Sequence, residues 1–169
     1  MRVALPFFML VPLMGSGCTA QCSAATLLGG RAYEIFANPV SFTIDNAALT
    51  DSPDFYSYTA PNNGISTWTF KWGGSNIGPI DVIIDGQTFA GTGDWDEVEC
   101  GHAILDFEGT YVHEATQARH TFSAGANLTV WQDKIGGLLI WNEAWELENG
   151  ESGTWKGSSH LDGTLTSGV

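Results

Sequence analysis

The fold is decided by two adjoining stretches, residues 103–114 (AILDFEGTYVHE) and residues 118–130 (ARHTFSAGANLTV). In the first stretch the odd positions are mainly apolar and the even positions mostly polar. In the second, the apolar residues take the even positions. A period of two is typical of a half-buried β-strand, because successive side chains point to opposite faces. The sequence therefore predicts two neighbouring antiparallel strands that share one apolar face.

The register of these two strands follows if the chain turns at Thr116-Gln117. The pairs that then face each other are Leu105 with Leu128, Phe107 with Ala126, Tyr111 with Phe122, and His113 with His120. Cross-strand pairs stabilise a sheet by about 0.2–1 kcal/mol each, and a slip of one residue would put every apolar side chain on the wrong face. Thr-Gln is a poor pair for a two-residue turn, so a longer loop is the alternative.

The rest of the chain repeats this pattern of short alternating segments between turn residues, and it contains 21 glycines. Asp85-Gly86 is a hairpin signal, because both residues tolerate the positive φ of a tight turn. The sequence predicts one all-β domain over residues 31–169, an antiparallel meander of about 8–10 strands forming a β-barrel or β-sandwich. No major helix is expected after the N-terminal segment. The predicted strands are 40–45, 54–60, 65–72, 79–85, 87–92, 94–99, 103–114, 118–131, 138–147 and 154–166.

Charge limits the partners that the protein can have. Its 169 residues include 6 lysines and arginines against 19 aspartates and glutamates, for a net charge of -13. Such a field repels phosphate backbones, so no nucleic-acid partner is expected. It also disfavours attachment to an anionic membrane surface through charge alone.

The N-terminus has the pattern of a secretory signal peptide, assigned here to residues 1–17. Arg2 precedes an apolar run over residues 3–14, which is shorter than the roughly 20 residues that a membrane-spanning helix needs. A tether of small residues, 18–30, then leads into the domain. These features predict export from the cytoplasm.

Residues 15–18 (GSGC) resemble the lipobox of bacterial lipoproteins, in which a cysteine after small residues carries the lipid. The resemblance implies lipidation of Cys18 and a place in the cell envelope, with the membrane as a partner only through this anchor. Cys22 and Cys100 are then left as a disulfide pair in an oxidising compartment. The alternative is cleavage by ordinary signal peptidase, which gives a periplasmic or secreted protein.

The first candidate site is the segment of residues 141–145 (WNEAW). Alternation places Trp141, Glu143 and Trp145 on one face, and Tyr111 lies on the apolar face of a strand close by. Indole rings beside a carboxyl suit a sugar, because the rings stack on its apolar face and the carboxyl accepts hydrogen bonds from its hydroxyls. These four residues are the predicted ligand site. The alternative is a Glu143 that faces water or is paired in the core.

Glu143 is also the one candidate for catalysis, as a general acid or base acting on a carbohydrate. Glycoside hydrolysis needs a second carboxyl about 5–10 Å away. The carboxyls of Asp106, Glu108 and Glu114 fall on the opposite, polar face of their strand, and no partner for Glu143 is identified.

Two metal sites are weighed, although no cofactor is predicted. His113 and His120, as direct neighbours, could share zinc, but zinc takes at least a third protein ligand and no spacing selects one. Asp94 and Asp96, with Asp85 near them, could offer oxygen atoms to calcium. The alternatives are a stacked histidine pair at a hairpin end and an acidic edge strand that discourages aggregation.

Three functions are compatible with these patterns. The first is a non-catalytic cell-envelope module that binds a small molecule or glycan in an aromatic-lined site. The second is a carbohydrate-active enzyme that uses Glu143, and the third is a structural component of the cell surface. The aromatic residues of the segment 68–72 are expected in the core and not in a site.

Overall fold

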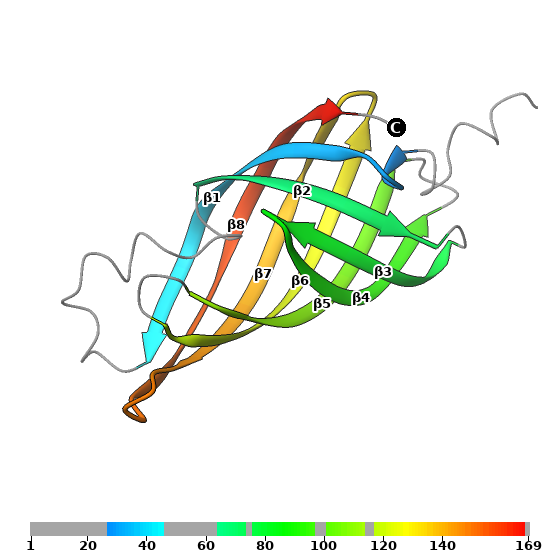
Figure 1. The fold of residues 1–169 in the computed structure, drawn as a ribbon. Helices are drawn as coiled ribbons and strands as arrows, with labels where there is room; N and C mark the ends of the chain where they lie inside the picture. The colour runs from blue at the N-terminus through cyan, green and yellow to red at the C-terminus, as the bar shows by residue number, and fades with distance from the viewer. Residues whose placement is uncertain (1–26, 46–63, 74–75, 97–100, 114–116, 168–169) are drawn as a thin grey trace, which may run out of the picture.

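The computed structural model describes residues 27–45, 64–73, 76–96, 101–113 and 117–167. Eight antiparallel strands form one closed barrel in chain order, and β1 pairs with β8 to complete it (Figure 1). The strands are β1 (Ala32–Asp45), β2 (Gly64–Trp72), β3 (Ile77–Ile84), β4 (Gln87–Asp96), β5 (His102–Val112), β6 (Arg119–Trp131), β7 (Lys134–Glu146) and β8 (Ser152–Ser167).

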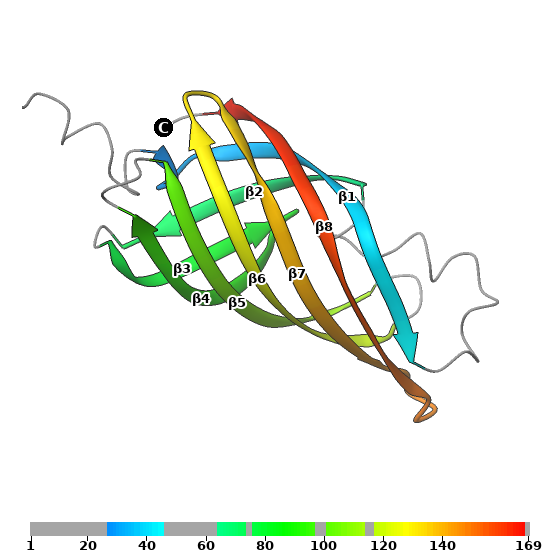
Figure 2. The same ribbon diagram turned by 180° about the vertical axis from the view of Figure 1, so that it is seen from behind.

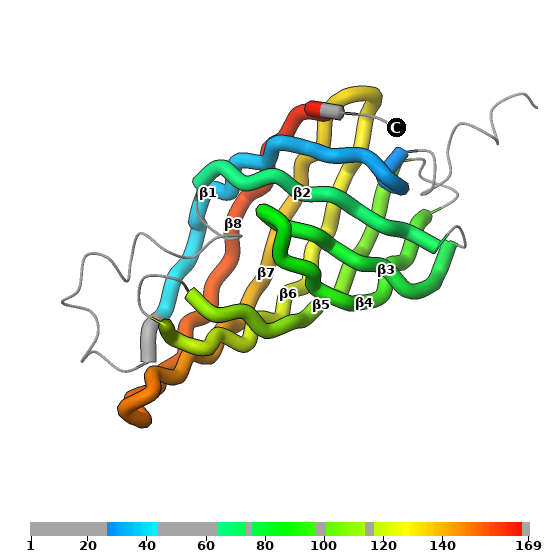
Figure 3. The backbone as a smooth tube through the Cα atoms, in the orientation of Figure 1, coloured from blue at the N-terminus to red at the C-terminus, as the bar shows by residue number. Residues whose placement is uncertain are grey.

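The predicted all-β meander is confirmed, and of the two predicted architectures the structure is the barrel. Figure 2 shows β8 between β1 and β7, where the first and last strands close the ring. Within the described residues, no helix is long and apolar enough to cross a membrane. The barrel has two ends, and Figure 3 shows the turn between β6 and β7 (yellow) at one and the turn between β7 and β8 (orange) at the other.

Two predicted strands join into one, and others lie outside the described residues. The stretches 87–92 and 94–99 were expected as separate strands, but β4 continues through Gly93, which pairs with Gly78. The predicted strand 54–60 and the three cysteines, Cys18, Cys22 and Cys100, fall outside the described residues, so the lipid and disulfide assignments stay predictions.

The predicted hairpin at Asp85-Gly86 is confirmed. Ile84 pairs with Gln87 across it, and the turn residues have φ angles of 48° and 84°. The Asp85 carboxyl also accepts a hydrogen bond from the amide of Thr67 at 2.7 Å, and the Asp85 amide donates to the Thr67 carbonyl at 2.9 Å. The hairpin is therefore fastened to β2.

The predicted register of β5 and β6 is wrong by two residues, while the predicted faces are right. Tyr111 pairs with His120, Leu105 with Ala126 and Phe107 with Ala124. A shift of two preserves the face of every side chain, because the side-chain period of a strand is two. The cause is the turn, in which the His113 carbonyl accepts from the amide of Gln117 and the His113 amide donates to the Ala118 carbonyl. The chain thus turns through a loop longer than Thr116-Gln117.

An irregularity in β1 reverses which of its residues face inward. Ala37 pairs with Leu161 and faces the core, but the register of β1 against β8 shifts between Pro39 and Ser41. Beyond the shift, Phe42 pairs with Gly157, which lies on the inward face of β8. A β-bulge has this effect because it adds one residue to one strand only.

The interior divides into two regions along the barrel axis. The apolar half, toward the turn between β6 and β7, is built mainly from hydrocarbon and aromatic side chains, and its members include Leu28, Phe70, Trp72, Trp95, Leu105, Leu128 and Ile135. The polar end, toward the turn between β7 and β8, contains the buried side chains of His113, His120 and Glu143 among aromatic rings. The three rings of residues 68–72 are buried, as predicted.

The last residues of the predicted tether lie against the apolar half. Leu28 is completely buried, and the Gly30 amide donates to the Phe70 carbonyl at 2.8 Å. Tyr33 adds a hydrogen bond from its hydroxyl to the Leu27 carbonyl at 2.6 Å. These contacts cover the interior at this end.

Candidate functional site

The candidate site is the polar end of the barrel interior, formed by inward-facing residues of β5, β6, β7 and β8. Tyr111 on β5 pairs with His120 on β6, which in turn pairs with Trp145 on β7. One row deeper, Glu143 pairs with Phe122 on one side and with Trp155 on the other. Alternation along four adjoining strands therefore brings one carboxyl, one imidazole and one phenol together.

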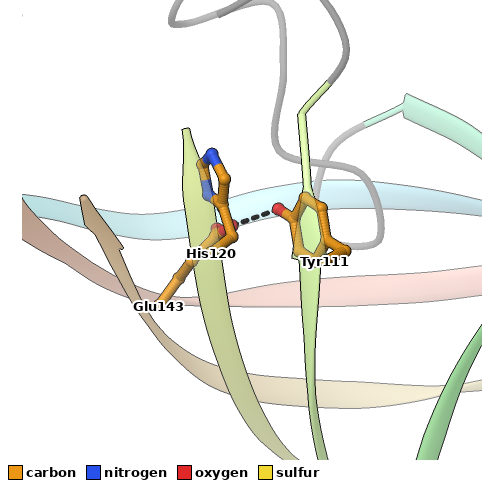
Figure 4. Close-up of polar contacts among 3 residues, drawn as sticks. All are labelled: Tyr111, His120 and Glu143. Atoms are coloured by element: carbon orange, nitrogen blue, oxygen red, sulfur yellow. Dashed lines mark hydrogen bonds and ion pairs between the residues drawn. The ribbon is translucent and has the colours of Figure 1, made fainter. Parts of the chain in front are cut away.

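Glu143 is the centre of this group, and its side chain is almost completely buried, with 1% of its surface exposed. Its Oε1 atom accepts a hydrogen bond from the Tyr111 hydroxyl and lies 2.7 Å from Nδ1 of His120 (Figure 4). Both partners reach the same oxygen, because Tyr111 and His120 are neighbours on adjacent strands. A carboxylate accepts hydrogen bonds only, so with Glu143 ionised Nδ1 of His120 is the donor.

The other carboxyl oxygen, Oε2, is buried and has no hydrogen-bond partner among the described residues. The same holds for the indole nitrogen of Trp141, Nε1, two residues earlier on the same face of β7. Buried polar groups without partners are rare in native proteins, because each costs about 1–3 kcal/mol. Oε2 of Glu143 is thus an acceptor, and Nε1 of Trp141 a donor, that no described residue satisfies.

Aromatic contacts hold the imidazole of His120 in place. The ring stacks on Tyr111, with 4.7 Å between centroids and 11° between planes, and its edge meets Trp155 at 5.9 Å. His113 lies 6.2 Å from it at 78°. With one ring face covered and Nδ1 held by Glu143, the orientation of the imidazole is fixed.

Trp141 has space for its indole because its two cross-strand neighbours are small. It pairs with Ala124 on β6 and with Gly157 on β8. A methyl group at Gly157 would come within 3.0 Å of the indole and 2.2 Å of the Ser41 carbonyl oxygen. Ala124 and Gly157 therefore leave the space that the Trp141 indole fills.

Phe42 is the partly exposed member of the aromatic rings at the polar end. Its ring lies 5.7 Å from Trp141 and 6.4 Å from Trp155, both of which are buried, yet 41% of the Phe42 side chain is exposed. Phe42 is therefore a partly exposed, inward-facing ring in direct contact with the two buried indoles of the candidate site.

The four residues predicted as a ligand site are all buried on the interior face at this end. Trp141, Glu143 and Trp145 share one face of β7 as expected, and Tyr111 donates to Glu143. Sequence reasoning missed Trp155 and Phe42. The alternation of Trp155, Gly157, Ser159 and Leu161 along β8 was a usable signal for Trp155. No signal pointed to Phe42, because the bulge that turns it inward leaves no mark in the pattern.

The histidine pair does not have the predicted geometry. His113 is displaced from His120 by the register shift, and His120 is bound to Glu143 instead. Within the described ranges, no group of three or more His, Cys, Asp and Glu side chains is arranged to hold a metal ion. Among the described residues, no third ligand for a zinc ion lies beside His113 and His120.

The aspartates weighed for calcium lie on the outer wall at the other end. A hollow of about 460 Å³ is lined there by Asp94, Asp96 and His102, among other residues. Asp85, expected near them, is at the opposite end of β4 and is bound to Thr67. The predicted trio of aspartates is not brought together.

Of the three carboxyls considered as catalytic partners of Glu143, Asp106 and Glu108 also lie on the outer wall, and Glu114 lies outside the described residues. Asp106 and Glu108 are exposed and line a hollow of about 410 Å³ over β4 to β7, where small residues leave space. This hollow is separated from Glu143 by the sheet itself. Among residues whose burial is described, Glu143 is the sole buried carboxyl.

No family model, curated protein or solved structure matches this chain. The functional argument therefore rests on the geometry of the polar end.

Proposed function

We propose that the protein is a cell-envelope binding module that takes a small polar ligand at the polar end of its barrel. The observation that carries the proposal is the pair of buried, unpartnered atoms on β7, Oε2 of Glu143 and Nε1 of Trp141. A ligand with one donor and one acceptor would satisfy both. The location in the envelope rests on the N-terminal pattern.

The surroundings of the two atoms support the same proposal. Three aromatic rings that contact one another, those of Trp141, Trp155 and Phe42, lie at the same end of the barrel as the Glu143 carboxyl and can stack on a ligand. An eight-stranded barrel has an interior just wide enough to be filled by side chains or to hold one small ligand. We place the entry of the ligand at Phe42, because this ring contacts Trp141 and is partly exposed.

Hydrolysis of a carbohydrate with Glu143 as acid or base is less well supported. That chemistry needs a second carboxyl about 5–10 Å from the first. The residues that fix Glu143 are a phenol and an imidazole, and both engage Oε1. Such an arrangement orients a carboxyl for recognition, and binding is therefore the function we put forward.

The proposal is tested by thermal unfolding of the full exported protein with a panel of sugars, amines and metal salts. A ligand that binds only the native state at 100 times its Kd raises the stability by about 2.7 kcal/mol. Glu143→Gln and Trp141→Phe each remove one recognition atom and should abolish the increase. Glu146→Gln and Trp131→Phe, exposed positions on β7 and β6, are the matched controls and should retain it.

Two results would count against binding at this site. One is a panel in which no compound raises the unfolding temperature, which favours a structural role at the cell surface. The other is a stabilising compound whose effect is unchanged in both Glu143→Gln and Trp141→Phe, which places its site elsewhere and leaves an internal water as the partner of the two atoms.

A further inference from the structure

We propose that the ligand is a hydroxylated amine, with its ammonium group on Glu143 and a neighbouring hydroxyl on Trp141. Amino alcohols and amino sugars are the simplest compounds of this class. The inference rests on the binding function proposed above and narrows it from a polar ligand to a cationic one.

The carboxyl determines the charge of the ligand. The two described partners of Glu143 occupy Oε1, so Oε2 is left for a donor that comes from outside. The lysines and arginines of the described residues cannot supply it, because none of them is buried. Hydrogen bonds between an ammonium and a carboxylate are roughly twice as strong as those between neutral groups, so an ammonium satisfies this buried oxygen best.

The aromatic rings favour the same charge. The Trp155 ring contacts His120 and Phe42, with centroid distances of 5.9 Å and 6.4 Å, and its centroid is 6.5 Å from that of Trp145. A cation over the face of an indole gains about 0.5–2 kcal/mol, the larger value when the site is desolvated. A carboxyl that is surrounded by indoles therefore recognises an ammonium through two independent interactions.

The charge of the whole protein acts in the same direction at longer range. A net charge of -13 attracts cations to an opening on the surface and repels anions, which raises the association rate of a cationic ligand. This attraction is screened by salt, with a Debye length of about 10 Å at 0.1 M. The on-rate of the ligand should therefore fall as salt is added.

Trp141 determines which second polar group the ligand needs beside its ammonium group. Its Nε1 is a donor only and has no partner, whereas an ammonium group offers no acceptor. The ligand must then bring an oxygen acceptor close to its ammonium group, since Glu143 and Trp141 are two residues apart on one face of β7. A hydroxyl on an adjacent carbon meets this requirement.

The experiment is calorimetric titration of the full exported protein with two matched pairs of compounds. Glucosamine is compared with glucose, and ethanolamine with ethylene glycol, so that each pair differs only in an amine against a hydroxyl. We expect the amine of at least one pair to bind about tenfold or more tightly than its neutral match. In Glu143→Gln this ratio should fall below about threefold, while Glu146→Gln should preserve it.

The outcomes separate this inference from the proposed function. If both members of each pair bind equally, or only a neutral compound binds, the inference is overturned and binding at the polar end stands. If an amine binds tightly but Glu143→Gln keeps the full ratio, the ammonium is not on Glu143 and the inference is again overturned. If no compound of the wider panel binds, both fail together.

Discussion

The two regions of the barrel interior are built on the same strands and differ in what those strands carry. In the apolar half, the buried hydroxyl of Ser66 accepts a hydrogen bond from Nε1 of Trp68 at 2.8 Å. In the polar end, Glu143 has one satisfied oxygen and one without a protein partner. Buried polar groups are satisfied in the first region and left without partners in the second, as expected if the first serves stability and the second is the binding site proposed above.

The largest effect is expected in the apolar half. Phe70→Ala removes a completely buried ring that packs on Tyr33 and Trp68, with centroids 6.2 Å away in both cases. The lost transfer free energy and the cavity should lower the free energy of unfolding by about 3–5 kcal/mol, measured by urea denaturation. Ile65→Ala, on the exposed face of the same strand, should change it by less than about 0.5 kcal/mol. Equal effects would mean that the core is not where the structure places it.

A smaller effect is expected from filling space in the polar end. In Gly157→Ala the new methyl group would meet the Ser41 carbonyl oxygen at 2.2 Å and the Trp141 indole at 3.0 Å. Overpacking of this kind costs about 1–3 kcal/mol, because backbone or indole must move. Gly136→Ala is the matched control on the neighbouring strand, since its methyl group would meet nothing closer than 3.5 Å. A tolerated Gly157→Ala would show that Trp141 is loosely held.

The comparison also shows how far the sequence alone could lead. The faces of β5 and β6 follow from the alternation of apolar and polar residues, so the burial of Tyr111 could be predicted. In β7 the alternation placed Glu143 and Trp145 on one face but left open whether that face points inward. The cross-strand partner of each residue could not be predicted, because the period of two determines only the face of a side chain, whereas the turn determines the register. An error of two residues set His120 opposite His113, and the link between His120 and Glu143 was thereby hidden.

The inward position of Phe42 could not be predicted from the sequence for a related reason. The bulge near Val40 changes which residues of β1 face inward, and it is visible only as a shift in the pairing of β1 with β8. Without that shift, the simple alternation that turns Tyr33 and Ile35 inward assigns Phe42 to the outer wall. Alternation therefore predicts the inward-facing residues of a regular strand more reliably than those that follow a β-bulge.

The hydrogen bonds of two tyrosines give a direct comparison between the regions. Tyr111→Phe withdraws the hydroxyl that donates to the buried carboxyl of Glu143, and leaving a buried acceptor short of a donor costs about 1–3 kcal/mol. Tyr33→Phe withdraws the hydroxyl that donates to the Leu27 carbonyl, which is partly exposed and can turn to water. This second change should cost about 0.5–1.5 kcal/mol. Denaturation midpoints of both variants measure the difference, and a larger loss for Tyr33→Phe would contradict the central role of Glu143.

The smallest effect concerns alkaline pH and belongs to the apolar half. Burial raises the pKa of Tyr33 above its ordinary value of 10.0, and the nearby Arg31 offsets part of this rise. As pH increases through about 10, the unfolded chain loses the phenol proton before the folded protein does, so the unfolded state is favoured. The contribution of Tyr33 to stability is therefore complete below pH 10 and is lost above it, with a slope of at most about 1.4 kcal/mol per pH unit. Urea denaturation at pH 8 and pH 11 should show the advantage of the native protein over Tyr33→Phe shrinking with pH. Because all other titrating groups are common to the two proteins, a constant difference would show that the Tyr33 phenol is open to water, and that the apolar half is not sealed at this end.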